Sequence, residues 1–174
     1  LGQEIKIGRR GSLTAEIVVS GKQGHVAYPQ LAENPIPRLI RVLDRLTRQT
    51  LDTGNADFEP SNLEVTILGA PNAATNVIPA VARAKINIRY NTEWTRPRLE
   101  AWVRSHVDAV AREMPMWVQV TFSGTGDVFL TKPGPLVALM QQSVAAETGR
   151  TPELTTNGGT SDARFIQAYC PVIE

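Results

Sequence analysis

The feature that most restricts the fold is a run of strictly alternating residues at positions 81–90. Apolar side chains occupy one side of this run and polar side chains the other, namely Ala82, Ala84, Ile86, Ile88 and Tyr90 against Arg83, Lys85, Asn87 and Arg89. Successive side chains of a β-strand point to opposite faces, so the pattern predicts a strand with one buried and one polar face. Such a strand needs other strands at its edges and a second layer over its apolar face.

Neighbouring segments supply these partners. Alternation predicts further strands at 13–19, 63–67 and 118–122. A helix is expected to begin at Pro35 behind an Asn34 cap, with an apolar stripe of Ile36, Leu39, Ile40, Leu43 and Leu46. A second helix is expected at 96–112. The order strand, helix, strand, strand, helix, strand predicts an α+β, ferredoxin-like fold, in which two helices cover one face of a four-stranded antiparallel sheet.

The chain changes character after Phe122. A glycine- and proline-rich stretch is followed by a predicted helix at 134–148, a loop that runs into a short helix, and an apolar segment at 168–173 that is interpreted as a buried strand. This tail has too few apolar residues to form a core alone, so we expect it to be a piece of a second, α/β domain. The chain starts at Leu1 rather than Met and stops just after an apolar run, and we expect a fragment.

Composition excludes several classes of protein. Hydrophobic residues make up 42% and charged residues 20%, which is typical of a folded globular chain. The net charge of +1 and the scattered Lys and Arg residues give no long-range attraction to nucleic acid or to an anionic membrane, and the strands lack the exposed aromatic pairs of RNA-binding sheets. No apolar run approaches the roughly 20 residues that span a bilayer. A single cysteine predicts a reducing, cytoplasmic location.

The stretch SGKQGHVAYP, residues 20–29, places one of only two histidines on a glycine-flanked turn. His25 is expected to be partly exposed and able to donate a hydrogen bond or a proton to developing negative charge. The alternative is a loop histidine that only satisfies a backbone carbonyl, and the residues alone leave both interpretations open. His106, beside a helical apolar stripe, is interpreted as structural, and Cys170 as a buried small hydrophobe.

Two features favour anion binding. Arg89 lies at a strand end, where a guanidinium can clamp a carboxylate with two hydrogen bonds, whereas Arg83 and Lys85 are interpreted as solvated. The stretch NGGTSDARF, residues 157–165, presents backbone N–H groups and hydroxyls to an anion, or is an ordinary helix start capped by Thr160 or Ser161. No H-E-x-x-H, G-x-S-x-G or Walker-type motif is present, and no cluster of cysteines, so this sequence alone neither holds a metal nor activates a nucleophile.

Several segments taken together resemble one family. They are IKIGRRGSLTAEIVVSGKQGHVAYPQLAENPI, TNVIPA, INIRYNTEWT, SGTGDVFLTKPG and GGTSDARF. In order along the chain, they are similar to the M20 family of metallopeptidases and amidohydrolases, and most similar to its desuccinylase members. Those members hydrolyse N-succinyl-LL-2,6-diaminopimelate to succinate and LL-2,6-diaminopimelate, in lysine and diaminopimelate biosynthesis.

The resemblance implies a homodimeric, two-domain enzyme that acts on a small-molecule substrate. A catalytic domain would carry two zinc ions, with cobalt as an alternative at one site, and an inserted ferredoxin-like domain would form the dimer interface. Residues 1–10 would then end the first part of the catalytic domain, 11–124 would form the dimerisation domain, and 125–174 would return to the catalytic domain. The metal ligands and the general base would lie outside this sequence, and this segment alone would be inactive.

The resemblance also implies residue roles. His25 would reach into the partner subunit's active site and hydrogen-bond the oxyanion formed as the succinyl amide is attacked, and Asn76 would cross with it. Arg9, Arg89 and Arg164 would face substrate carboxylates. Further substrate contacts would come from Gly159 and Thr160, and Tyr28 would support the His25 loop. Ala163 stands where the desuccinylase pattern usually has glycine, which leaves the acyl substrate open.

Two alternatives remain at this stage. One is a related M20 deacylase such as acetylornithine deacetylase, which shares the architecture. The other is a stand-alone, non-catalytic ferredoxin-like dimerisation module, which the complete strand and helix pattern and the missing metal ligands would also fit.

Overall fold

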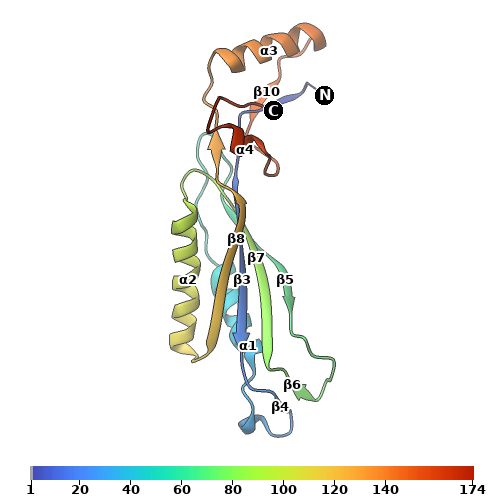
Figure 1. The fold of residues 1–174 in the computed structure, drawn as a ribbon, viewed down its shortest axis with the longest axis vertical. Helices are drawn as coiled ribbons and strands as arrows, with labels where there is room; N and C mark the ends of the chain where they lie inside the picture. Colours follow the sequence, from blue (N-terminus) through green and yellow to red (C-terminus); the bar gives the residue numbers. More distant parts are fainter. Residues whose placement is uncertain (1) are drawn as a thin grey trace.

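The structure is a computed structural model that describes residues 2–174, except for the side chain of Thr125. The molecule is long and narrow (Figure 1). A twisted sheet forms its middle, a small turn-and-strand projection forms one end, and a helix together with both chain termini forms the other end.

The central sheet contains β3 (Gly11–Ser20), β5 (Asn62–Gly69), β7 (Val81–Tyr90) and β8 (Trp117–Gly126), in the spatial order β5-β7-β3-β8. All neighbouring strands are antiparallel, and β7 pairs residue for residue with β3, from Tyr90 opposite Gly11 to Val81 opposite Ser20. The four strands predicted from alternation are therefore confirmed.

Helices α1 (Pro35–Thr47) and α2 (Arg96–Glu113) lie on the same face of this sheet (Figure 1). The Asn34 side chain accepts a hydrogen bond from the Ile36 N–H at 3.1 Å, so the predicted cap of α1 is confirmed. The main core lies between the helices and the apolar sides of the strands, and its largest fully buried residues include Tyr90, Leu13, Ile17, Leu39, Leu46, Ile86, Ile88 and Leu99.

One member of the predicted helical stripe is exposed, and Ile36 is only partly buried. Ile40 is 53% exposed, whereas Val42, which the stripe did not include, is fully buried. Ile40 follows Leu39 by about 100° around the helix, which places it at the edge of the stripe, beside the outer strand β5.

The tail forms a second, smaller structure. Strand β1 (Glu4–Lys6) pairs in parallel with β10 (Glu153–Thr155), and β2 (Gly8–Arg9) pairs antiparallel with β9 (Phe129–Leu130). Helix α3 (Pro135–Thr148), as predicted, packs on this end and buries Val137 against Ile5 and Ile7. Its apolar cluster contains none of the residues of the main core.

The interpretation of residues 168–173 as a buried strand is wrong, and so is that of Cys170 as a buried hydrophobe. After the short helix α4 (Ala163–Ile166) the chain continues as a turn, in which the Cys170 N–H donates to the Ile166 carbonyl at 3.2 Å. Helical turns at the end of α4 therefore leave Cys170 exposed and Tyr169 91% exposed. At Glu174 the chain returns to β1, where the backbone N–H and C=O groups of Glu174 and Lys6 form two hydrogen bonds with each other.

A projection at the opposite end of the sheet completes the fold. We call it the tip. It comprises residues 21–33, with β4 (Gly24–His25) and the 3₁₀ turn η1 (Pro29–Leu31), and residues 70–80, with β6 (Val77–Ile78). Strands β4 and β6 pair antiparallel, with His25 opposite Val77. Among the residues that the structure describes, no helix has the length and hydropathy to cross a bilayer.

Candidate functional site

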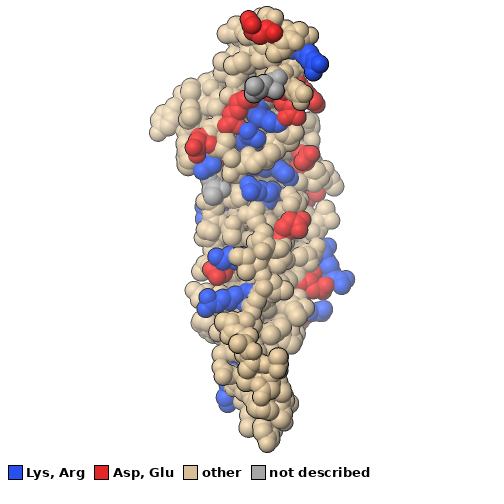
Figure 2. All heavy atoms as spheres, turned by 90° about the vertical axis from the view of Figure 1, so that its right-hand side faces the viewer, with Lys and Arg blue, Asp and Glu red and all other residues tan. Residues whose placement is uncertain are grey.

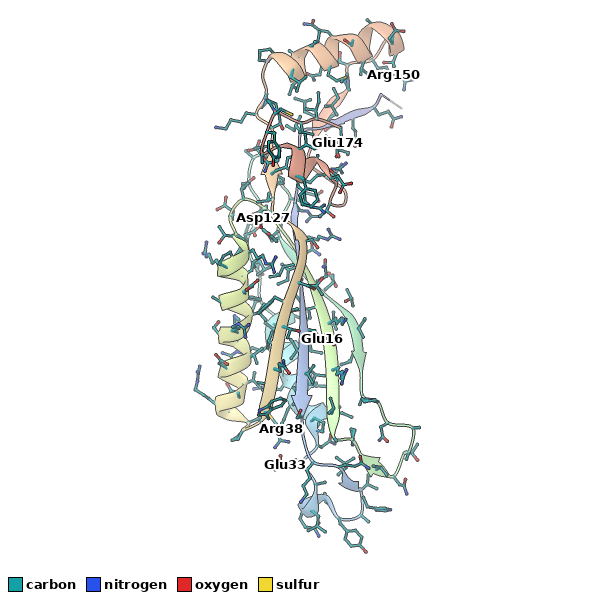
Figure 3. The ribbon with its side chains drawn as sticks, viewed as in Figure 1. Glu16, Glu33, Arg38, Asp127, Arg150 and Glu174 are labelled. Carbon is teal, nitrogen blue, oxygen red and sulfur yellow. The ribbon has the colours of Figure 1, made fainter. Side chains whose placement is uncertain are left out.

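The residues that the sequence singled out lie in two groups at opposite ends of the molecule. His25, Tyr28 and Asn76 belong to the tip, and Arg9, Gly159, Thr160 and Arg164 lie where the tail begins. Figure 3 marks these ends with Glu33 at the base of the tip and with Glu174 beyond the sheet. Strand β3 separates the groups, and ten residues of strand at about 3.3 Å each span roughly 33 Å.

His25 is exposed and oriented by the backbone that follows it. Its Nδ1 accepts a hydrogen bond from the Ala27 N–H at 3.1 Å, and its carbonyl accepts from the Tyr28 N–H at 2.9 Å. An Nδ1 that accepts carries no proton, so a neutral ring has its proton on Nε2. The outer nitrogen is therefore the donor.

The other two predicted tip residues are neighbours of this ring. The Asn76 side-chain amide lies 3.4 Å from His25 Nε2, and the Asn76 carbonyl accepts from the Val26 N–H at 3.0 Å. The Tyr28 ring lies 6.1 Å from the imidazole, centre to centre, at 55°. The chain thus brings His25, Tyr28 and Asn76 together, although 51 residues separate His25 from Asn76.

The surface of the tip has almost no charge. Residues 23–32 and 70–80 contain no Lys, Arg, Asp or Glu. Figure 2 shows this end of the visible face as nearly free of charged atoms, in contrast to the mixed charges above it. Three large hydrophobic side chains are exposed there, Val26 at 47%, Tyr28 at 58% and Leu31 at 62%.

At the other end, Arg9 holds both the chain end and a loop. Its guanidinium forms an ion pair with Glu174 at 2.6 Å, and its NH1 donates to the Asn157 carbonyl at 2.8 Å. Burial acts to raise the pKa of Glu174, but hydrogen bonds from Ser161 and Arg9 outweigh it and hold this pKa below its ordinary value. Glu174 is therefore a carboxylate in this pair at neutral pH.

Residues 157–162, which we call the glycine loop, begin at this contact. Gly158 has a φ of +93°, a conformation that favours glycine, and a Cβ there would lie 2.6 Å from Arg9 NH1 and displace that guanidinium. Gly159 faces open space, and Thr160 is half-buried. The Ser161 hydroxyl accepts from the Ala163 N–H at 3.2 Å, but the N-cap position of α4 is Asp162, and neither Thr160 nor Ser161 occupies it.

Arg164 lies across the junction between the sheet and the tail. Its NH1 donates to the Ser161 carbonyl at 2.8 Å. Its side chain packs directly on Gly126, where any Cβ would collide with it. Ala163 is 4% exposed and is accommodated at the start of α4.

Arg89 points from the uncovered face of β7, near the same end of the sheet, opposite Ser12. Its NH1 and the Arg164 Nε are buried and have no hydrogen-bond partner among the described residues. Both are donors that an anion could use. Of the residues interpreted as solvated, Arg83 is exposed, and Lys85 lies 4.0 Å from Glu16.

Sequence reasoning did not identify the α1–β5 loop, residues 51–61, which reaches this end of the molecule. Asp52 organises it by accepting from Asn91 Nδ2 at 2.8 Å, Gly54 N at 2.9 Å, Ser61 N at 3.0 Å and Trp94 Nε1 at 3.0 Å. An open pocket of about 460 Å³ lies between this loop and residues 155–157. The only signal in the sequence was a composition rich in Asp, Asn, Gly and Pro.

His106 is half-buried against the edge of Trp102, with 4.6 Å between the ring centres. Burial and the neighbouring Arg45 lower its pKa. Within residues 2–174, no group of three or more His, Cys, Asp and Glu side chains is arranged to hold a metal ion.

The whole chain is similar in sequence to known proteins. Over all 174 residues the chain is 55% identical to a succinyl-diaminopimelate desuccinylase of Acidiphilium cryptum, and 52% identical to one of Parvibaculum lavamentivorans. It covers 46% and 44% of those proteins, and so spans a little under half of their length.

Solved structures show the same fold at low identity. A tripeptidase from Staphylococcus aureus superposes with a TM-score of 0.78, and the aminopeptidase PepT from Bacillus cereus with 0.76. Each is 18% identical, and each match covers 98% of this chain and 44% of the other. The model of the M20 peptidase dimerisation domain matches residues 7–115. The mixed α/β chain thus belongs to the M20 family, as its motifs indicated, and residues 7–115 are its peptidase dimerisation domain.

Proposed function

We propose that this chain is the dimerisation domain and part of the catalytic domain of a succinyl-diaminopimelate desuccinylase. The enzyme would hydrolyse the succinyl amide of N-succinyl-LL-2,6-diaminopimelate to succinate and LL-2,6-diaminopimelate. The observation that carries this proposal is an identity of 50–55% to desuccinylases of that name, which extends over essentially the whole chain. The glycine loop and the arginines around it support it.

The charge of the substrate suits these arginines. N-succinyl-diaminopimelate carries three carboxylates, and we propose that Arg9, Arg89 and Arg164 bind them, with Gly159 and Thr160 as donors beside them. Arg89 and Arg164 each have a buried nitrogen with no partner in the described chain. Arg9 is already paired with Glu174, so a substrate carboxylate at Arg9 has to compete with that ion pair.

We further propose that His25 acts on the partner subunit. About 33 Å of strand separates it from the glycine loop of its own chain, which is too far for one substrate to touch both. In a twofold dimer, each subunit can present its tip to the other. There the Nε2–H of His25 would donate to the oxygen that becomes negative as the amide carbonyl is attacked. Asn76 would enter with it, and Tyr28 would support it.

The outer strand β5 and helix α1 are the proposed dimer interface. Strand β5 is an edge of the sheet, and Ile67 (55%), Leu68 (60%) and Ile40 of α1 are exposed along it. An apolar hollow of about 170 Å³ lies between Leu68 and α1. An exposed apolar edge strand invites pairing with another strand, which a second copy of the chain would supply.

We also propose that residues 11–124 are a ferredoxin-like domain and that residues 1–10 and 125–174 belong to the catalytic domain. The sheet order β5-β7-β3-β8 and the position of both helices on one face support the first assignment. The separate apolar cluster around Ile5 and Val137 supports the second.

The proposed cofactor is a pair of zinc ions, with cobalt as an alternative at one site. The described residues do not form a site for them, and we propose that their ligands belong to other parts of the parent protein. The balanced charge and the single cysteine support a cytoplasmic enzyme with no nucleic-acid or membrane partner.

The direct test is an assay of the full-length protein with added zinc on N-succinyl-LL-2,6-diaminopimelate and on N-acetylornithine. We expect turnover of the succinyl substrate. Good turnover of acetylornithine without detectable desuccinylation would show that the acyl substrate is wrong. No turnover of either substrate, by a protein that dimerises, would favour a non-catalytic dimerisation module.

A further inference from the structure

Among the described residues, one hydrogen bond joins the residue that precedes the glycine loop to the α1–β5 loop. The Thr156 hydroxyl donates to the Asp57 carbonyl at 2.5 Å, across 99 residues of sequence. Asp57 belongs to the domain of the central sheet, and Thr156 immediately precedes the glycine loop. The bond therefore crosses from one apolar cluster of the molecule to the other.

The acceptor is held in place by its own loop. The Asn55 side chain accepts from the N–H groups of Asp57 at 3.1 Å and Phe58 at 3.0 Å, and the Phe58 ring is 3% exposed. Asp52 fixes both ends of the same loop through Gly54 and Ser61. The Asp57 carbonyl is thus presented by a segment with little freedom to move.

On the donor side, the residue after Thr156 is held from the other direction. Arg9 donates to the Asn157 carbonyl at 2.8 Å, and Lys6 contacts the Asn157 side chain. Gly158 then lies against the Arg9 guanidinium. The first residues of the glycine loop are consequently held from two sides. Lys6 and Arg9, on strands β1 and β2, hold one side, and Thr156 ties the other side to the sheet domain.

We propose that Thr156 is a positioning residue that fixes the position of the glycine loop relative to the dimerisation domain. The role of that loop in substrate binding rests on the proposed function, whereas the tie between the two loops does not. Thr156 ties the glycine loop to the α1–β5 loop. This tie determines the distance between the proposed hydrogen-bond donors of Gly159 and Thr160 and the Arg89 side chain, which lies on strand β7 of the sheet. Loss of the hydroxyl leaves the loop attached at one side only.

The test uses the full-length protein with Thr156→Val, which removes the hydroxyl and keeps the shape. Thr156→Ser restores the hydroxyl, and Thr151→Val changes an exposed threonine nearby. Hydrogen exchange is followed by mass spectrometry in peptides that cover 53–58 and 157–162. We expect Thr156→Val to accelerate exchange about two- to tenfold in both peptides, as loss of one hydrogen bond predicts. The serine variant and the Thr151 control should behave as wild type.

Kinetics on the succinyl substrate complete the test. We expect KM to rise about two- to tenfold in Thr156→Val with little change in kcat, and to recover in Thr156→Ser. Unchanged exchange, or faster exchange in 157–162 alone, would overturn the tie between the loops. Coupled exchange with an unchanged KM would overturn the positioning role. A wild-type protein without desuccinylase activity would contradict the proposed function instead, and the exchange data would still decide the tie.

Discussion

His25 shows how a short segment can define the orientation of a side chain. Gly24 and the turn after His25 place the ring outside the core. The Ala27 N–H occupies Nδ1, so in a neutral ring Nε2, which lies beside the Asn76 side chain, is the nitrogen that can donate. The sequence indicated exposure on the tip but did not indicate which nitrogen carries the proton, because that depends on a turn hydrogen bond two residues away.

At this residue, we predict that His25→Ala in the full-length enzyme lowers kcat by about a hundred- to a thousandfold, since an oxyanion donor of this kind is worth about 3 to 4 kcal/mol. Zinc content, measured by metal analysis, should not change. His106→Asn, which alters the other histidine, is the matched control and should keep kcat near wild type. A kcat within twofold of wild type for His25→Ala would contradict the oxyanion role.

Asp52 is the residue on which the α1–β5 loop depends. Burial acts to raise its pKa, but the hydrogen bonds that it accepts, led by those from Ser61, outweigh burial and lower the pKa below the ordinary value. In Asp52→Asn an amide N–H would face the Trp94 N–H, so we expect a loss of about 1 to 2 kcal/mol in the free energy of unfolding, measured with urea at pH 7. Asp108→Asn, at an exposed position of α2, should have almost no effect.

The same residue predicts a pH dependence. Because the pKa of Asp52 is lower in the folded state, its contribution to stability is complete well above pH 4 and is lost as the pH falls below that value. Urea midpoints of wild type and Asp52→Asn should therefore converge as the pH is lowered from 7 toward 3. A constant difference between the two midpoints over this range would show that Asp52 is not the source of the pH dependence of stability.

At the scale of elements, periodicity predicted the long ones and missed the short ones. The strands β3, β5, β7 and β8 and the helices α1 and α2 each extend over enough residues to show their period. The two-residue strands β4 and β6 have no period to detect, and their pairing joins segments that are far apart in sequence. The prediction failed at residues 168–173, because a short apolar run fits a buried strand and a helical turn equally well.

The two edges of the sheet give an element-scale prediction. Leu68→Arg places a charge on the apolar edge of β5, and we expect the full-length protein to become monomeric at micromolar concentration in sedimentation velocity and to lose kcat. Trp117→Arg, which changes a residue 65% exposed on the opposite edge strand β8, is the matched control and should remain dimeric. A dimeric Leu68→Arg variant would show that the interface lies elsewhere.

At the scale of the whole molecule, the elongated shape separates the two groups of site residues. The glycine loop and its arginines are at one end of the sheet, and the His25 tip is at the other (Figures 1 and 3). The motifs in the sequence predicted both groups, but only the fold shows that β3 holds them apart. Within one subunit the two groups are too far apart to act on one substrate, which is the physical basis for the proposal of a dimeric active site.

The most direct test is complementation between two impaired full-length variants, His25→Ala and Arg164→Ala. If His25 acts on the partner subunit, a mixed dimer has one site with neither change and one site with both. Equal amounts exchanged at random should then recover about one quarter of wild-type activity, because half of the dimers are mixed and each has one intact site. If His25 acts within its own subunit, every site keeps one change, and the mixture should be no more active than the two variants measured separately.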